Sequence, residues 1–546
     1  MLKTNYRWMP HLEGAVPSAG QGKRISTYNI ALEGWRRGLS LTFYGSIEGK
    51  NELKIKYSLS NNERTHYFSL SMGDKVTNEA FNICQDKEQT KKYLSAKNVP
   101  VPEGGVFGPK DNDKDICKFA KSLGFPLVLK PVDSNAGNGV FANIQNIDEF
   151  KELLIHVKEE LGFKHIIVEK YIKGAEYRIF VIEDKVTGAI KRRPASIVGD
   201  GKKTVYKLIE NINKIRKSNP HLTNRLIKVD REVKNSLAVY GYNLDSIPEK
   251  GKRVFLRDKS NLSKGGDAID VTDNLTNKLK EIAISAGKAI PGLTHYGVDM
   301  IIDPNGNMGT ILEVNARPGI GGHLFPMEGQ PRDLAKEIIN YYFPETINIE
   351  RSNLYFDFDS IVESLTSRAA ECIKIGNCTS TGQLFGKKFI ISGKVQKVGY
   401  RKWITRKARE RNLNGYTKNL KNGKVVVLVA GPEEHIVNDF KDLCYQGPPK
   451  AIVHSIKEKE WKKPLEIGFE IRTTHKEQLK MLKSNEDILN NLKQENKKLQ
   501  SDLKNLYNEK LKFEKKYQQT INSRSWKLTY PLRYISTILR NKTKHK

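Results

Sequence analysis

Four short apolar segments end in charged or amide side chains, and they constrain the fold more than any other feature of the sequence. They occupy residues 126–131, 166–172, 297–299 and 311–315. Short apolar runs that stop at turn residues are typical of buried strands, and their polar ends must reach solvent or a binding site. Helical patterns alternate with such strands over 86–344, which predicts a large α/β or α+β enzyme body.

The first strand carries Lys130 near its end, and a loop of small residues follows at 133–139. A lysine at a strand end supplies a point charge, and glycines let backbone N–H groups approach phosphate oxygens. We therefore predict a polyphosphate site at Lys130 and at Ser134, Gly137 and Gly139 of the loop. An ordinary surface turn is the alternative explanation of the loop.

Oxygen ligands stand at the ends of the last two strands. Asp299 ends one strand, and Glu313 and Asn315 end the other. Hard oxygen ligands suit Mg²⁺, which commonly keeps several waters and shares phosphate oxygens. A solvated strand end would explain any one of these acids alone, but their order together favours a magnesium site.

The order of lysine, glycine loop, Glu-Lys strand, Asp strand and Glu-x-Asn strand resembles the ATP-grasp family. Residues 174–178, 193–201, 256–266 and 270–273 are similar, more narrowly, to the ligase part of cyanophycin synthetase and of bifunctional bacterial glutathione synthetases. The resemblance implies an ATP-grasp fold with ATP and Mg²⁺ as cofactors. It also implies a ligase that activates a carboxylate as an acyl phosphate and transfers the acyl group to an amine.

The same resemblance implies a role for each candidate residue. Arg257 and Arg317 are expected to neutralise oxygens during phosphoryl transfer, and a structural salt bridge is the alternative for each arginine. The acidic side chains Asp299 and Glu313 become magnesium ligands together with Asn315. The expected ATP contacts are Lys130 and Lys170 on the phosphates, Glu169 and Ile172 at the adenine, and Glu176 on the ribose.

Two departures from these relatives leave the substrates open. The D-alanine ligases have an arginine just before the first metal aspartate, where this chain has Gly297 and Val298, so that substrate is disfavoured. The sequence also lacks the full second ligase module of cyanophycin synthetase and the glutamate–cysteine ligase module of the bifunctional enzymes. The substrates of those relatives therefore do not transfer to this chain.

A smaller domain is predicted at 387–472, where the order strand, helix, strand, strand, helix, strand is the ferredoxin-like order. Arg401 stands at a helix start, a position that favours an anion. The segment resembles acylphosphatase, which implies that Arg401 binds phosphate and that Asn419 orients the attacking water. Lys397 stands where that family has glycine, so a binding or packing module without activity is the alternative.

Residues 476–520 predict a coiled coil, because apolar side chains fall in a heptad register. Asn496 on the seam favours one register and a parallel homodimer, and a solvated single helix is the alternative. The seam positions are Leu482, Leu489, Leu503 and Tyr517 on one side and Leu492, Leu499, Leu506 and Phe513 on the other.

The tail 523–546 contains seven Lys or Arg residues, no acidic residue and several aromatic side chains. This mixture predicts peripheral contact with an anionic membrane surface, and a solvated or protein-docking tail is the alternative. The tail also looks like those that follow coiled coils in bacterial glycosyltransferases. That analogy indicates cell-surface polymer assembly.

The composition limits the binding partners and the cellular location that we expect for this protein. The formal charge of +31 favours anionic partners, but the sequence shows no aromatic-basic motif of nucleic-acid readers, so no nucleic acid is expected. We find no apolar run of 18 residues and no signal-peptide pattern, which predicts a cytoplasmic protein, with peripheral contact at the inner membrane face through the tail. The five cysteines suit neither a disulfide framework nor a zinc site, so free thiols are expected.

The N-terminal residues predict a small α/β unit in which no chemistry is visible. Arg36 and Arg37 there either help to bind the acid or lie on the surface. The unit is expected to contain a helix over 25–37 and strands over 40–44, 53–59 and 67–70.

We thus predict an α+β protein, with an ATP-grasp fold, a ferredoxin-like acylphosphatase domain and a coiled coil in that order. The main interpretation is a ligase that takes a small carboxylate and an amine. The alternatives are an acylphosphatase or regulator whose ATP-grasp body only binds ATP, and a membrane-docked scaffold. The expected divisions are 1–75, 76–350 for the ATP-grasp domain, 351–386 for a linker, 387–472, 476–520 and 521–546.

Overall fold

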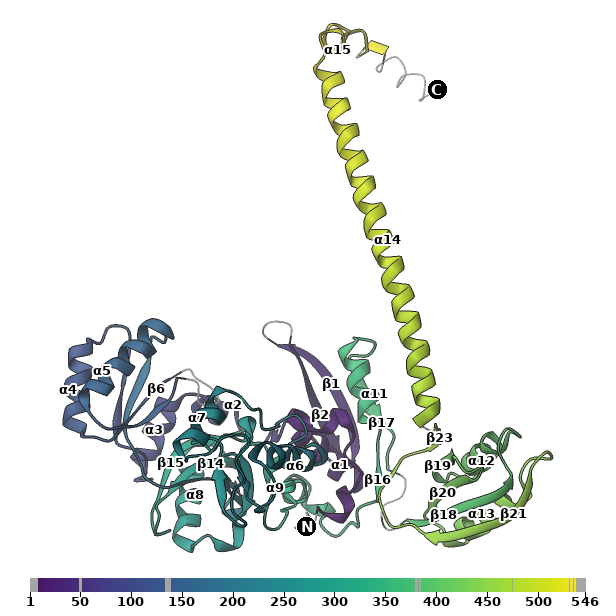
Figure 1. Cartoon of the computed structure of the whole chain (residues 1–546), viewed down its shortest axis with the longest axis horizontal. Helices are drawn as coiled ribbons and strands as arrows, with labels where there is room; N and C mark the ends of the chain where they lie inside the picture. The colour runs from purple at the N-terminus through teal and green to yellow at the C-terminus, as the bar shows by residue number, and fades with distance from the viewer. Residues whose placement is uncertain are drawn as a thin grey trace.

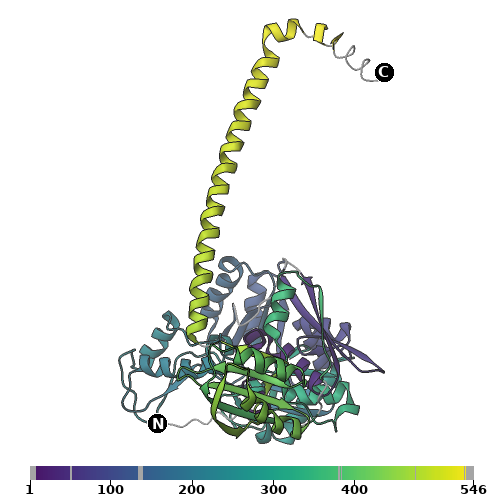
Figure 2. The same cartoon turned by 90° about the vertical axis from the view of Figure 1, so that its right-hand side faces the viewer.

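The computed structural model shows a body built on three larger sheets, a separate five-stranded domain at one end, and a long helix that projects away from both (Figure 1). The view turned by 90° shows the same projection (Figure 2). The residues described are 8–48, 52–132, 139–378, 382, 384–473, 475–529, 531–533 and 535–536.

The N-terminal unit is a five-stranded sheet covered by helix α1 (Ile25–Arg36), so the predicted helix and strands are present. Tyr28, Leu32 and Trp35 recur at helical spacing and bury one face of α1 against the sheet. The strand order is β17-β1-β2-β3-β4, with β1 (Ser40–Glu48), β2 (Glu52–Ser60), β3 (Thr65–Ser69), β4 (Met72–Gly73) and β17 (Cys372–Ile375).

The prediction of an irregular linker over 351–386 is wrong, because this segment contains regular structure. Its strand β17 pairs antiparallel with β1, with Ile375 opposite Leu41. Its aromatic residues Phe356 and Phe358 pack against the rings of α1 and β1. Phe356 and Phe358 are two residues apart, as on one face of a strand, but the run is too short for local periodicity to show that they belong to the core. The other elements are β16 (Leu354–Tyr355) and α11 (Phe358–Thr366).

Arg36 and Arg37 are buried and hold α1 in place, so neither of the two roles left open for them applies. Arg36 donates from Nε to the Leu354 carbonyl at 2.6 Å and from Nη1 to the His11 carbonyl at 2.9 Å. Arg37 pairs with the Glu33 carboxylate at 2.6 Å. Because these guanidinium groups are engaged inside the protein, they act as structural ties between distant segments.

Two antiparallel sheets form the rest of the body. One, in the order β5-β8-β6-β7, forms a lobe under α4 and α5, and the other, in the order β13-β10-β9-β14-β15, is covered by α8. A small subdomain of α6, α7, β11 and β12 has its own core. The bounds are β5 (Gly104–Phe107), α4 (Asp113–Leu123), β6 (Leu127–Pro131), β7 (Phe141–Ile144), α5 (Ile147–Ile155), β8 (Ile166–Lys170), β9 (Ala175–Ile182), β10 (Lys185–Arg193), β11 (Ser196–Val198), α6 (Val205–Ser218), α7 (Arg231–Val239), β12 (Arg253–Phe255), β13 (Asp267–Asp270), α8 (Asn277–Ala289), β14 (His295–Ile302) and β15 (Gly309–Asn315).

The separate domain has the predicted ferredoxin-like order, with four strands in the spatial order β21-β18-β20-β19 and a further strand, β23, parallel to β19. Helices α12 and α13 pack on the sheet around a core of their own. The bounds are β18 (Phe385–Lys394), α12 (Tyr400–Arg409), β19 (Asn414–Asn419), β20 (Val425–Gly431), α13 (Glu434–Gln446), β21 (Ile452–Glu460) and β23 (Phe469–Arg472).

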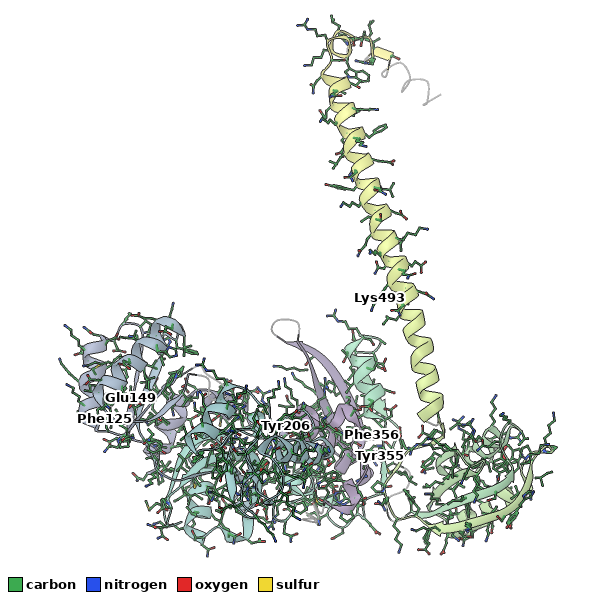
Figure 3. All side chains as sticks on the ribbon, viewed as in Figure 1. Phe125, Glu149, Tyr206, Tyr355, Phe356 and Lys493 are labelled. Carbon is green, nitrogen blue, oxygen red and sulfur yellow. The ribbon has the colours of Figure 1, made fainter. Side chains whose placement is uncertain are left out.

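This domain is docked onto the N-terminal unit through a shared core. Strand β16 pairs in parallel with β22 (Leu465–Glu466), and Leu428 of β20 belongs to the same apolar cluster as Leu354. Tyr355 and Phe356 lie at this junction, beside the N-terminal sheet (Figure 3). Backbone pairing and shared apolar burial together fix where the domain sits.

Helix α14 (His475–Asn522) covers the predicted heptads as one continuous helix, and Lys493 lies on it well away from the body (Figure 3). Its described seam residues, from Leu489 to Tyr517, are between 51% and 77% exposed. The coiled coil itself stays a prediction, and Leu482 lies among the residues whose side chains are not described.

Beyond α14, Ser523 caps α15 (Arg524–Leu528), and the Arg533 guanidinium lies 3.5 Å from the ring centroid of Trp526. The last ten residues of the tail lie outside the described residues. Among the described helices, none has both the length and the apolar character to cross a bilayer.

Candidate active site

The three predicted metal ligands lie together on two neighbouring strands. Asp299 of β14 is directly opposite Glu313 of β15, and Gly297 is opposite Asn315. Glu313 and Asn315 are two residues apart on one strand, so they share a face of the sheet. Directly opposed side chains in an antiparallel pair have Cβ atoms about 5 Å apart, which is within reach of one bridging cation.

The surroundings shift the pKa values of the two carboxyl groups in opposite directions. Although burial raises the pKa of Asp299, the guanidinium groups of Arg178 and Arg192 outweigh burial and hold that pKa below its usual value. Burial and the neighbouring Asp299 carboxylate raise the pKa of Glu313. A cation between the carboxylates would remove their mutual repulsion, so the donor set fits Mg²⁺.

Arg178 and Arg192 belong to this site, although the sequence analysis assigned them no role. Arg178 on β9 donates from Nε and Nη2 to the two Asp299 oxygens at 2.6 and 2.7 Å. Arg192 on β10 donates to Asp299 at 3.1 Å and also pairs with Glu176. Glu176 and Arg178 alternate with Tyr177, so they occupy one face of β9; this period-2 spacing was the available signal.

Glu176, predicted to hold ribose, faces the same cluster. Besides Arg192, it accepts a hydrogen bond from the Ser260 hydroxyl at 2.5 Å. Ser260 belongs to the segment 256–266 that resembles the relatives named above. The ribose contact stays a prediction, and the structure places Glu176 beside the predicted metal ligands.

The predicted phosphate lysine lies in a cleft that reaches the metal strand. Lys130 on β6 pairs with the buried Glu169 of β8 at 2.6 Å, and Lys91 approaches the same carboxylate at 3.3 Å. The cleft is lined by Lys130 and Glu169 from the lobe and by Glu313 from β15. It therefore joins three residues that the sequence places up to 183 positions apart. Lys91 is a further basic residue here that sequence reasoning missed.

The remaining predicted nucleotide residues lie around the lobe. Lys170 is exposed at the end of β8, and Ile172 is half-buried just beyond it. Gly139 has φ +67, and a Cβ there would meet the Pro131 ring at 2.9 Å, so this position requires glycine. Ser134 and Gly137 lie outside the described residues.

The two predicted catalytic arginines have different partners. Arg257 is almost fully buried and pairs with Asp230 at 2.6 Å and with Glu232, which is the salt-bridge arrangement named as its alternative. Arg317 lies two residues beyond Asn315, stacks over Phe81 at 4.1 Å and donates to the Ser69 hydroxyl at 3.4 Å. Arg317 is therefore beside the metal strand, whereas Arg257 is engaged with the α7 segment.

A second candidate cation site is filled by a side chain. His11, Glu33 and Asp333 bring ligand atoms within 4.8 Å of one another. The Arg351 Nη1 atom lies 2.9 Å from His11, 2.9 Å from Glu33 and 2.8 Å from Asp333. The guanidinium group thus already supplies the positive charge that a metal would bring.

In the ferredoxin-like domain, the loop before α12 and the end of β19 lie together. Gln396 donates from Nε2 to the carbonyls of Leu420 and Lys424, both at 2.9 Å, and so ties the loop to the turn that follows Asn419. Arg401 stands in the first turn of α12. The buried Oδ1 of Asn419 has no hydrogen-bond partner among the described residues, so it can accept a bond from a water.

Lys397 adopts the backbone conformation that glycine would favour. Its φ is +63, in the left-handed region, and Gly399 follows at +80. A left-handed conformation costs a non-glycine residue about 1–2 kcal/mol. The loop therefore keeps its glycine-type turn although a lysine occupies the position.

Family comparison agrees with this geometry. Residues 84–208 and 252–342 match the RimK-like ATP-grasp domain, and residues 387–471 match the acylphosphatase family. The chain carries a RimK-like ATP-grasp domain and an acylphosphatase domain. The predicted resemblances are confirmed, and ATP with Mg²⁺ is the cofactor pair of an ATP-grasp domain.

Curated relatives align with part of the chain. A cyanophycin synthetase of Nostoc sp. is 32% identical over 326 residues, which cover 58% of this chain and 35% of the relative. A bifunctional glutathione biosynthesis protein of Enterococcus faecalis is 34% identical over 337 residues, which cover 59% and 43%. This chain therefore spans less than half the length of either relative.

Two solved structures also align with parts of the chain. A bifunctional glutathione synthetase from Pasteurella multocida is 29% identical, covers 56% of this chain and 41% of its own, and has a TM-score of 0.43. An acylphosphatase from Bacillus subtilis is 30% identical, covers 16% of this chain and 98% of its own, and has a TM-score of 0.15.

We predict that Glu313→Gln weakens Mg²⁺ binding by about 10- to 100-fold, because one of two paired carboxylates is lost. In metal-free buffer the same change should not lower the melting temperature, since it removes a half-buried like charge beside Asp299. Thermal unfolding with and without Mg²⁺ measures both effects. The control is Glu281→Gln, an exposed acid on α8. Equal Mg²⁺ stabilisation of Glu313→Gln and the native protein would remove Glu313 from the ligand set.

We predict that Lys397→Gly changes acyl phosphate hydrolysis by less than about threefold, because the loop backbone already has the left-handed turn. Arg401→Ala should lower hydrolysis on the order of 100-fold, since it removes the charged phosphate contact. Release of phosphate from benzoyl phosphate by the full chain is the measurement. Arg406→Ala on the same helix, an exposed arginine, is the matched control. A tenfold gain in Lys397→Gly would show instead that the lysine obstructs the site.

Proposed function

We propose that the ATP-grasp domain is an ADP-forming ligase that activates a carboxylate as an acyl phosphate and joins the acyl group to an amine. The observation that carries this proposal is the opposed pair Asp299 and Glu313, of which Glu313 lines the same cleft as Lys130. The two carboxylates repel each other unless a cation lies between them, so the pair favours a site that works with Mg²⁺ beside the phosphate lysine.

The residues of the chain divide the work of phosphoryl transfer. Asp299, Glu313 and Asn315 would hold Mg²⁺, which when bound neutralises charge on phosphate oxygens. Lys130 presents a cation to the phosphates from the lobe. Arg178 and Arg192 fix the Asp299 carboxylate and hold further positive charge at the place where the transferred group carries its negative charge.

Amide formation then needs no side-chain nucleophile. The acyl phosphate is an activated anhydride, and the amine attacks its carbonyl carbon while phosphate leaves with the bonding electrons. Positioning is the main contribution of the protein to this step. Arg317, beside the end of β15, is the residue that we assign to the acid or its acyl phosphate.

The acylphosphatase domain would remove acyl phosphate that the ligase releases by mistake. An acyl phosphate that escapes the ligase would be hydrolysed where Arg401 holds its phosphate and Asn419 orients the water. The second candidate function is a regulator in which ATP binding only controls this hydrolase. Under both candidates, the left-handed backbone conformation at Lys397 favours an active hydrolase.

We predict that the full chain converts ATP to ADP and phosphate when it meets its acid and amine, because the acyl phosphate route uses the γ-phosphoryl group. Incubation with pooled amino acids, amino sugars and small acids, followed by nucleotide analysis and product mass, is the assay. Glu313→Ala should lose turnover, and Glu281→Ala should keep it. Release of AMP and pyrophosphate would exclude this mechanism.

We further propose that α14 pairs with a second copy of the chain and that the basic tail contacts the inner face of the cytoplasmic membrane. The exposed heptad residues would bury their apolar surface only against another helix. Two copies of the tail would add their membrane affinities by avidity. Work on a cell-surface polymer would suit this location.

Three chain lengths separate these two proposals. We predict a dimeric mass by light scattering for the full chain and for a chain that ends at Thr520, and a monomeric mass for a chain that ends at Thr473. Only the full chain should float with anionic vesicles, and added salt should weaken that binding. A monomeric full chain would contradict the coiled coil, and equal flotation of the two longer chains would contradict the role of the tail.

A further inference from the structure

A cavity of about 540 Å³ opens on the N-terminal unit, between the sheet and the segment that leads into α2 (Asn78–Gln85). It is lined by residues of β1, β2 and β3 and by the segment 72–78. Volumes of this size accommodate small-molecule ligands, and most such sites combine apolar walls with a few polar groups. The sequence indicated no chemistry in this part of the chain.

One row of side chains runs across the strands at this cavity. Tyr44 is opposite Lys56, and Lys56 is opposite Ser69, so the three side chains lie on one face of the sheet. Tyr67 alternates with Phe68 and shares the face of Ser69. The row thus combines a cation, a hydroxyl and two tyrosine rings.

The aromatic wall offers ring faces, and the Tyr44 hydroxyl is engaged within the sheet. Tyr44 and Tyr67 lie with ring centroids 6.5 Å apart, and Tyr67 is 57% exposed. Tyr57 and Phe68 alternate with this row and lie on the opposite face of the sheet, where they are stacked at 5.1 Å and buried, so the strands that carry the row are firmly anchored in the core. The Tyr44 hydroxyl bonds to Ser58 at 3.0 Å. A ligand therefore meets apolar ring faces here, and these favour flat or ring-shaped partners.

The other wall is tied to the sheet and to the loop after the metal strand. Asp74 accepts from the Tyr67 backbone N–H at 2.8 Å and bonds to His66 at 2.7 Å. The buried Ser71 hydroxyl donates to the Pro318 carbonyl at 2.6 Å. The cavity wall and the active-centre loop are consequently held in one arrangement.

Arg317 connects the cavity to the predicted reaction centre. Its guanidinium donates to Ser69, the last residue of the row, and stacks on Phe81 of α2. Ser69 therefore has a cation on each side, Lys56 across the strand and Arg317 from the loop. The Asp74 carboxylate also lines the cavity but is engaged with His66 and the Tyr67 N–H, so the two cations and the hydroxyl beside the aromatic wall complement a carboxylate attached to a ring.

We propose that this cavity binds the acid substrate, with the carboxylate at Ser69 and Arg317 and a ring-shaped body against Tyr44 and Tyr67. The substrate class is a ring-bearing carboxylic acid, either an aryl acid or a sugar acid. This inference rests on the proposed ligase function for the fate of the acid, but binding to the cavity needs neither ATP nor metal.

The test is saturation-transfer NMR on the full chain without ATP, with phenylacetate and glucuronate as probes and hexanoate as the linear acid. We expect at least one ring acid to bind more tightly than hexanoate. Tyr67→Ala and Lys56→Met should weaken that binding at least tenfold, whereas Tyr67→Phe should keep it. Tyr206→Ala is the matched control, because Tyr206 is 49% exposed, lies on α6 and is not among the residues that line the cavity.

The outcomes test the assignment of the cavity independently of the proposed ligase function. Preferential binding of phenylacetate assigns an aryl acid, and preferential binding of glucuronate assigns a sugar acid. Ring acids that bind no better than hexanoate, or that bind equally to Tyr67→Ala, overturn the proposal. Ring-acid binding without ADP formation for any acid and amine pair would leave the cavity assigned and refute the ligase.

Discussion

The opposed carboxylates of Asp299 and Glu313 are the constraint on which the rest of the site depends. Asp299 is buried and Glu313 is half-buried, and the central sheet brings guanidinium groups to the Asp299 carboxylate from two further strands. Arg178 lies on β9, next to β14, and Arg192 lies on β10, one strand further. The antiparallel order of the sheet therefore sets the electrostatics of the centre.

The N-terminal unit links that centre to the rest of the protein. Its sheet presents Ser69 and Ser71 to the loop that follows the metal strand, and its far strand β17 comes from residues more than 300 positions later. The same unit shares a core with the acylphosphatase domain. Figure 1 shows the lobe of β5 to β8 and that domain at opposite ends of the body, so under the proposed function an acyl phosphate would reach the acylphosphatase domain only after release.

The candidate site residues could be grouped from the sequence because the motif residues occur in a fixed order along the chain. Lys130, Asp299, Glu313 and Asn315 each follow an apolar strand, and the register of β14 with β15 brings the last three together. Arg192 and Lys91 escaped prediction because a single charged residue on an amphipathic element is typical of any surface. Their partners Asp299 and Glu169 come from strands far away in the sequence.

The sequence by itself determined the two domain types, the strand ends that carry the chemistry and the long C-terminal helix, because each depends on local periodicity or on a short motif. Tertiary structure alone decided that 351–386 completes the N-terminal sheet, that Arg36 and Arg37 are internal ties, and that a ring-lined cavity opens beside Arg317. These features depend on contacts between distant segments, and a local pattern contains no information on which segments will meet.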